Sequence, residues 1–145
     1  MDENGYLPPA ATWVREQLEQ IDAAGGDTRA VDIQGRRVVV LTMRGRRTGA
    51  LRRVPLMRVE HEGVYAAVAS KGGAPEHPDW YHNLTADPWV ELHDGTEHLQ
   101  TRARMIEGAE REQWWSRCVE AFPTYADYQT ATERQIPVFL LEPEG

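Results

Sequence analysis

The sequence contains one cysteine, one lysine and no long apolar run. Because Cys118 has no partner, the chain cannot form an internal disulfide, which suits a reducing cytoplasm. A membrane-spanning helix needs about 20 largely apolar residues, and no such stretch is present. The first ten residues have neither a basic start nor an apolar segment, so no secretion signal is expected. We therefore predict a cytoplasmic protein without a stable membrane span, and leave association with a membrane surface open.

Several common catalytic motifs are also missing. Gly45 and Gly49 flank three polar residues, but this segment joins two predicted strands instead of opening a helix, which excludes a Rossmann or P-loop site. The histidines have no zinc-binding spacing, so no metal is predicted. Ser70 beside Lys71 suggests a Ser-Lys hydrolase, yet neighbouring residues on a strand face opposite sides and no oxyanion motif is visible. Cys118 is expected to be a buried apolar residue within a helix.

Hydrophobic patterning predicts one domain over residues 1–145, with an N-terminal helix and linker in residues 1–30. The helix is expected from Thr12 to Ala24, with Trp13, Leu18 and Ile21 roughly on one side. Strands are expected at 38–43, 52–59, 64–70, 89–94, 98–105 and 136–141, and further helices at 77–86, 107–121 and 125–133.

Short turns between several of these strands favour an antiparallel meander as the simplest topology. Five or six strands with helices at the margins are typical of a small α+β barrel. The helix at 107–121 is expected to be buried through apolar positions at helical spacing, namely Ile106, Trp115, Val119 and Phe122.

Basic residues are concentrated in one segment. The chain has a net charge of −7, but residues 36–58 contain eight arginines and no aspartate or glutamate. A local excess of positive charge attracts and orients anions, and guanidinium groups bind phosphates and carboxylates equally well. Because side chains alternate along a strand, not all of these arginines can share one site. We expect Arg46, Arg47 and Arg52 to reach a ligand.

The only lysine and a set of aromatic residues add to this pattern. Lys71 precedes two glycines, which permit positive φ and close approach of the backbone to a ligand. A compact ammonium in an arginine-rich chain suggests a specific contact, and a solvated lysine at a strand end is the alternative. Phe122, Tyr125 and Tyr128 share one face of a short helix. That face is either core or a wall for a flat ligand with a polar edge.

Seven segments then occur in an order that we recognise from a known family. They are 41–49 (LTMRGRRTG), 54–56 (VPL), 68–74 (VASKGGA), 77–84 (HPDWYHNL), 86–88 (ADP), 122–129 (FPTYADYQ) and 134–137 (RQIP). On these segments the chain resembles the deazaflavin-dependent nitroreductase family, which uses the reduced coenzyme F420. The resemblance extends from about residue 36 to the C-terminus, and the N-terminal helix matches only loosely.

The resemblance implies a split β-barrel of the flavin-reductase type, with about six mainly antiparallel strands, that binds coenzyme F420. The phosphate and oligoglutamate tail of F420 would lie along the basic segment, and its ring near the glycine loop. The implied cofactor-binding residues are Arg46, Arg47, Thr48, Arg52, Pro55, Ala69, Ser70, Lys71, Gly72, Asp79, Trp80 and Asn83. The acceptor would contact Met57, Phe122, Tyr125 and Tyr128, and the two tyrosines would orient it or donate a proton.

The implied activity is hydride transfer from reduced deazaflavin to a flat acceptor such as a quinone or a nitroaromatic compound. Asp79 stands where relatives often carry an apolar residue, and Phe122 replaces a tyrosine; both differences bear on the choice of acceptor. An FMN-binding oxidoreductase of the same fold and a non-catalytic F420 binder are the alternatives. Nucleic-acid binding is not expected, because the chain is acidic and lacks a nucleic-acid motif. We expect a monomer or homodimer that acts on a small molecule.

Overall fold

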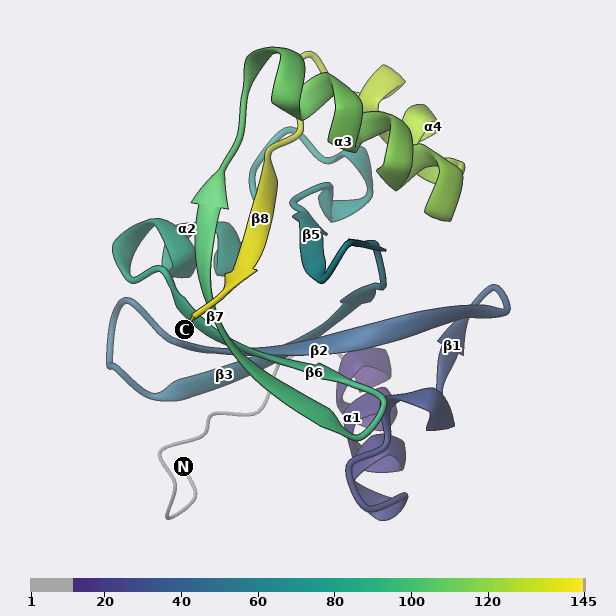
Figure 1. The fold of residues 1–145 in the computed structure, drawn as a ribbon, viewed down its shortest axis with the longest axis vertical. Helices are drawn as coiled ribbons and strands as arrows, with labels where there is room; N and C mark the ends of the chain where they lie inside the picture. The colour runs from purple at the N-terminus through teal and green to yellow at the C-terminus, as the bar shows by residue number, and fades with distance from the viewer. Residues whose placement is uncertain (1–11, 145) are drawn as a thin grey trace.

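Antiparallel strands curl into an α+β half-barrel in the computed structural model, which describes residues 12–144 (Figure 1). The longer strands are β2 (Arg36–Arg44), β3 (Leu51–Met57), β5 (Val64–Val68), β6 (Trp89–Asp94), β7 (Glu97–Met105) and β8 (Val138–Pro143), and the shorter ones are β1 (Asp32–Ile33) and β4 (Glu60–His61). The helices are α1 (Thr12–Ala23), α2 (Asp79–Ala86), α3 (Gly108–Ala121) and α4 (Thr124–Thr130), with 3-10 turns η1 (Thr28–Ala30) and η2 (Lys71–Gly73). The predicted α+β split-barrel class is confirmed.

Strand pairing departs from the meander that the short turns predicted. β2–β3 and β6–β7 are hairpins of consecutive strands, but β2 also pairs with β6, and β5 pairs with β8. β8 pairs with β7 on its other side. Short turns determine only the pairing of consecutive strands. The pairing of β2 with β6 arises because residues 38–41 of β2 are buried, which requires a strand on each side of β2. The predicted meander was therefore wrong.

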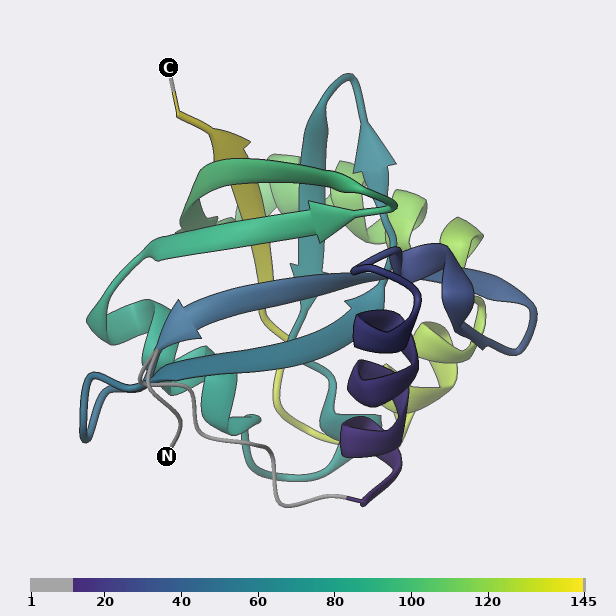
Figure 2. The same cartoon turned by 90° about the horizontal axis from the view of Figure 1, so that it is seen from below.

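Helices cover the two ends of the half-barrel (Figures 1 and 2). α1 buries Leu18 and Ile21 together with apolar residues of β2. At the opposite end, α3 buries Trp114 and Cys118 against β5 and β8. Cys118 is fully buried, as predicted, and burial raises the pKa of its thiol to about 12, which keeps it protonated and inert. Trp80 of α2 belongs to the cluster between these ends.

The predicted buried face of α3 was only partly right. Trp115 and Val119 are half-buried, whereas Arg111 and Trp114 face the core. Arg111 can occupy a core position because its guanidinium lies 4.9 Å from the Trp115 ring centroid and donates a 2.6 Å hydrogen bond to the Ile136 carbonyl. Apolar spacing alone does not predict this placement, because burial of the arginine depends on a partner on a distant strand.

Two predictions fall outside the described part of the chain: the absence of a secretion signal in residues 1–10, and the side-chain position of Trp13. Between residues 12 and 144, no helix is long and apolar enough to cross a membrane. Helices α1, α2 and α3 begin and end within two residues of their predicted bounds.

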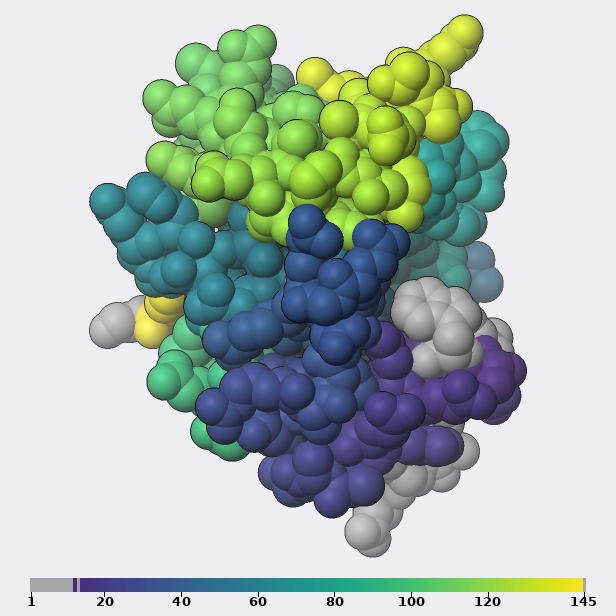
Figure 3. All heavy atoms as spheres, turned by 90° about the vertical axis from the view of Figure 1, so that its right-hand side faces the viewer, coloured from purple at the N-terminus to yellow at the C-terminus, as the bar shows by residue number. Residues whose placement is uncertain are grey.

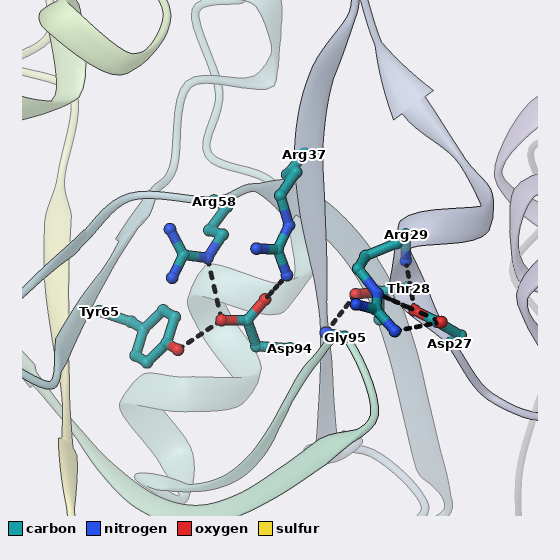
Figure 4. A network of polar contacts seen from close by, with 8 residues as sticks. All are labelled: Asp27, Thr28, Arg29, Arg37, Arg58, Tyr65, Asp94 and Gly95. Carbon is teal, nitrogen blue, oxygen red and sulfur yellow. Dashed lines mark hydrogen bonds and ion pairs between the residues drawn. The ribbon is translucent and has the colours of Figure 1, made fainter.

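A buried carboxylate joins distant parts of the barrel (Figure 4). Asp94, at the end of β6, accepts hydrogen bonds from Arg37 at 2.7 Å, from Arg58 at 2.9 Å and from the Tyr65 hydroxyl. Burial acts to raise the pKa of Asp94, but the hydrogen bonds from Tyr65 and Arg58 and the charges of both arginines outweigh burial and lower it below the usual 3.8. Asp94 therefore stays ionised and connects β2, β5 and the segment after β3.

Candidate functional site

Two cavities border α2. The arginine pocket has a volume of about 170 Å³ and is lined by Gly45, Arg46, Arg47, Thr48, Arg52, Asp79 and Asn83. The apolar groove has a volume of about 790 Å³ and is lined by Val14, Gln17, Asp32, Ile33, Gln34, Val54, Pro55, Leu56, Met57, Val68, Ser70, Lys71, Gly72, Pro78, Trp80, Phe122, Tyr125 and Tyr128. Asp79 and Trp80 are consecutive, and each lines a different cavity. The two spaces are therefore neighbours along α2.

The arginine pocket is shaped by the β2–β3 turn and held by α2. Within the turn, the Gly49 amide donates to the Gly45 carbonyl at 2.8 Å. A buried amide on α2, Asn83 Oδ1, accepts hydrogen bonds from the Arg46 backbone N–H at 3.1 Å and from its guanidinium at 3.2 Å. The same guanidinium donates to the Asp79 carbonyl at 3.4 Å. Asn83 thus positions the turn that carries Arg47 and leads into Arg52 at the start of β3.

Not all arginines of the basic segment are available to a ligand. Arg37 and Arg58 form ion pairs with Asp94, and Arg53 forms one with Asp22. By contrast, the side chains of Arg47 and Arg52 form no hydrogen bond or ion pair with any residue between 12 and 144. The pocket therefore holds two guanidinium groups that pair with no carboxylate between residues 12 and 144, although Asp79 also lines it, and such groups bind anions.

The remaining arginines of this segment, Arg36 and Arg44, pack against aromatic rings. The Arg36 guanidinium lies 5.9 Å from the Phe122 ring centroid, and that of Arg44 lies 5.5 Å from Trp89. Neither arginine lines the pocket. The predicted arginines Arg46, Arg47 and Arg52 are thus the members of the segment that converge on one cavity.

One wall of the apolar groove is the loop after β5. This strand was expected to continue through Ser70, but it ends at Val68, and Lys71 has a φ of +46°. Because the chain turns there, Ser70 and Lys71 both line the groove instead of facing opposite sides. Lys71 Nζ lies 3.2 Å from Glu76 Oε1, with both side chains largely exposed, and not beside the Ser70 hydroxyl. The arrangement gives no support to a Ser-Lys hydrolase.

The opposite wall is aromatic. The Phe122 and Tyr125 rings meet edge to face with centroids 5.0 Å apart, and Tyr128 lies 6.3 Å from each of them. Within residues 12–144 neither tyrosine hydroxyl has a hydrogen-bond partner. Burial, together with the nearby Cys118 and Tyr128, raises the pKa of Tyr125 far above its usual value of 10. The Tyr125 hydroxyl therefore remains protonated and can donate a hydrogen bond to a ligand.

Most of the predicted site residues border one of these cavities. The pocket takes in Arg46, Arg47, Thr48, Arg52, Asp79 and Asn83, and the groove takes in Pro55, Met57, Ser70, Lys71, Gly72, Trp80, Phe122, Tyr125 and Tyr128. Ala69 lines neither cavity. Its side chain is fully buried, its N–H donates to Pro137, and its carbonyl accepts from Arg134. Ala69 therefore supports the loop from behind and has no free group for a ligand.

Sequence reasoning missed a third wall made by α1 and the β1–β2 hairpin. Val14, Gln17 and Ile33 come from these elements and line the groove. Figure 3 shows this side of the molecule, where the blue hairpin meets the yellow-green helices. Gln17 Nε2 donates to the Asp32 carbonyl at 3.4 Å, while its Oε1 is buried without a partner among the described residues. In the sequence, the only indication of this wall was Gln17, a polar residue within an amphipathic helix.

Comparison with known proteins identifies relatives of this chain. A family model described as F420H2-dependent quinone reductase matches residues 13–143. The F420H2-dependent quinone reductase Rv1261c of Mycobacterium tuberculosis is 34% identical over 106 residues, which are 71% of each chain. A solved F420-H2 dependent reductase, FDR-A, is 55% identical with a TM-score of 0.70, covering 72% of this chain and 93% of the other. A structure described as a domain-swapped dimer is 53% identical with a TM-score of 0.73, covering 90% and 97%.

Proposed function

The chain belongs to the F420H2-dependent quinone reductase family, and from this premise we propose that its two cavities divide the coenzyme and the acceptor between them. The reaction is the reduction of a quinone by reduced coenzyme F420. The observation that carries the assignment is that α2 borders both a pocket with unpaired guanidinium groups and a groove with an aromatic wall. We propose that one domain, residues 1–145, contains the whole site.

The residues of this chain fit F420 by their chemistry. Within the described part of the chain the side chains of Arg47 and Arg52 pair with no carboxylate, which suits a phosphate or a carboxylate-rich tail. Gly72 borders the groove, and a Cβ added there would meet no atom within 4 Å, so this side of the loop is open to a ligand. We assign the tail to Arg46, Arg47, Thr48, Arg52 and Asn83, with Asp79 supporting Arg46 through its backbone carbonyl, and the ring to Pro55, Ser70, Lys71, Gly72 and Trp80. Reduced F420, when bound, supplies a hydride from C5 of its deazaflavin.

The protein residues around the acceptor position it and exclude water. Met57 and Phe122 offer apolar contact to a flat ring, and the Tyr125 and Tyr128 hydroxyls offer hydrogen-bond donors to its oxygen atoms. The raised pKa of Tyr125 makes this residue a poor proton donor but a persistent hydrogen-bond donor. Of the two roles expected for Tyr125, we therefore assign orientation of the acceptor by a hydrogen bond to a quinone oxygen, and the proton that completes the hydroquinone is left to Tyr128 or solvent.

Replacing Tyr125 with phenylalanine should lower kcat/KM for a quinone about tenfold, since one hydrogen bond to the acceptor is lost while the ring wall stays in place. The dissociation constant for F420 should not change. Tyr81→Phe is the matched control, because Tyr81 stacks on His77 and lines neither cavity. The wild-type pH profile should show no loss of activity from Tyr125 ionisation below about pH 10. A basic limb near neutrality that disappears in Tyr125→Phe would contradict this assignment.

The test of the proposed function is a parallel titration with F420 and with FMN, followed by steady-state assays with reduced F420. The expected result is saturable F420 binding, weak or absent FMN binding, and coenzyme oxidation that depends on added quinone. Tight FMN binding without F420 binding would replace this proposal with the FMN-dependent alternative. F420 binding without turnover across a panel of quinones and nitroaromatics would favour a carrier. The same panel decides whether nitro compounds are substrates.

We also propose a cytoplasmic location, which the presence of a single cysteine supports, because the chain cannot form an internal disulfide. The related structure described as a domain-swapped dimer makes a homodimer the alternative to a monomer. Light scattering across a range of protein concentrations distinguishes these two states, and vesicle flotation tests for association with a membrane surface.

A further inference from the structure

Arg134 does not line the apolar groove, yet it holds one of the groove walls in place. Its guanidinium donates to three backbone carbonyls of the loop after β5: Ala69 at 3.2 Å, Ser70 at 2.8 Å and Ala74 at 2.9 Å. It forms no ion pair with any residue between 12 and 144. Its guanidinium therefore interacts with these carbonyls and with the His77 ring, whose Nδ1 lies 3.1 Å away. The planar fork of arginine suits this task, because a lysine ammonium cannot reach all three acceptors at once.

The loop that Arg134 binds has a conformation that needs support. Lys71, Gly72 and Gly73 have φ values of +46°, +64° and +82° in succession. A left-handed conformation is unfavourable for a residue with a Cβ, such as Lys71, and persists where surrounding contacts impose it. The hydrogen bonds to Ser70 and Ala74 bracket these residues on both sides. Arg134 therefore holds the segment from which Ser70, Lys71 and Gly72 line the groove.

The same loop packs directly on the helix that carries the aromatic wall. A Cβ on Gly73 would lie 2.8 Å from the Tyr128 carbonyl oxygen and 3.1 Å from the Ala131 Cβ, so only glycine fits this contact. The backbone of Arg134 is itself tied to α4, because Gln129 Nε2 donates to its carbonyl at 2.8 Å. Arg134 and Gly73 thus connect the loop that carries Ser70, Lys71 and Gly72 to the helix that carries Tyr125 and Tyr128.

We propose that Arg134 is a positioning residue that sets the spacing between the Ser70–Lys71–Gly72 wall and the Tyr125–Tyr128 wall. The expected effect on quinone turnover rests on the proposed function, whereas the expected effect on the loop conformation does not. A misplacement of about 1 Å between reacting groups costs up to about 100-fold in rate. Loss of the fork should therefore affect turnover more than binding of the coenzyme tail, which lies in the separate arginine pocket.

The test compares Arg134→Lys with the control Arg104→Lys. Arg104 also uses its fork on two partners, Glu110 and Glu142, but on the exposed surface away from both cavities. In Arg134→Lys, kcat/KM for the quinone should fall about 10- to 100-fold while the F420 dissociation constant changes less than about threefold. Gly73→Ala disturbs the packing of the same loop on α4. It should likewise lower kcat/KM for the quinone with little change in the F420 dissociation constant. Arg104→Lys should leave both quantities unchanged.

Hydrogen exchange provides a readout that does not depend on F420 chemistry. The Gly73 and Ala74 amides donate within the loop, to Ser70 and Lys71, and should exchange at least about tenfold faster in Arg134→Lys. Unchanged exchange and wild-type turnover would overturn the proposal. So would a fall in turnover that merely follows the fraction of unfolded protein. If the wild type itself failed to oxidise reduced F420, the proposed function would fail while faster exchange in Arg134→Lys still supported the role of Arg134.

Discussion

Replacing both Arg47 and Arg52 with alanine should weaken F420 binding by about 100-fold, equivalent to about 2.7 kcal/mol. Both guanidinium groups line the arginine pocket and neither pairs with a carboxylate between residues 12 and 144, so an anionic tail does not have to displace one of those carboxylates. Charge-assisted hydrogen bonds contribute about 1.5–3 kcal/mol each, and the exposure of Arg47 reduces its share. Each single variant should therefore show a smaller loss, about five- to thirtyfold.

The measurement is a fluorescence titration of F420 at about 50 mM and about 500 mM salt, because screening weakens exposed charge pairs. Wild-type binding should weaken with salt, and the double variant should lose most of that dependence. Arg44→Ala combined with Arg102→Ala removes the same net charge from positions that line neither cavity, and should bind F420 nearly as tightly as the wild type. Equal weakening in both double variants would mean that general charge, and not the arginine pocket, attracts the tail.

The arginine pocket also shows how far sequence reasoning reaches. Arg46, Arg47 and Arg52 were predicted correctly to converge because they lie in and beside one tight turn, where local geometry determines position. The pairing of Arg37 and Arg58 with Asp94 was not predicted, since Asp94 lies 57 residues from Arg37 and 36 residues from Arg58 in the chain. Residues 36–58 contain no acidic residue, but carboxylates from elsewhere in the chain pair with some of their arginines. The sequence therefore overstated the positive charge that is available to a ligand.

The groove walls show the same division between local and distant structure. The stripe of Phe122, Tyr125 and Tyr128 follows from helical spacing and was identified from the sequence. Val14 and Gln17 line the same groove, but only the packing of α1 beside β3 brings them there. Residues whose positions depend on contacts between distant elements could not be found without the fold, whatever the strength of their local pattern.

Replacing Asp94 with asparagine should lower the free energy of unfolding by about 3 kcal/mol, because two arginines then lose their buried counterion. Asp94 is only 8% exposed and accepts hydrogen bonds from Arg37, Arg58 and Tyr65 (Figure 4). Asparagine keeps the size of the side chain but puts an amide N–H₂ where one acceptor oxygen stood, facing donors. The network joins β2, β5 and β6, so its loss should reduce the cooperativity of the whole barrel. Chemical denaturation at neutral pH measures this change.

Asp27→Asn is the matched control, because Asp27 also pairs with an arginine but does so at the surface. Its pKa is lowered to about 2 by hydrogen bonds from Arg29, yet solvent screens the pair. Asparagine retains the oxygen that caps η1, so little stability should be lost. A loss in Asp94→Asn no greater than in Asp27→Asn would show that the buried network does not stabilise the barrel.

The pH dependence of Asp94→Asn separates the charge of Asp94 from its shape. The folded-state pKa of Asp94 is lowered, so its carboxylate stabilises the fold fully above the usual value of 3.8. This contribution is lost as the pH falls below 3.8 and through the lower folded-state pKa, because the folded state must then accept a proton that the unfolded state already binds. The wild type should therefore lose stability more steeply than Asp94→Asn below about pH 4, and the two unfolding curves should converge in acid. Parallel curves across this range would mean that the ionised form of Asp94 is not what the arginines recognise.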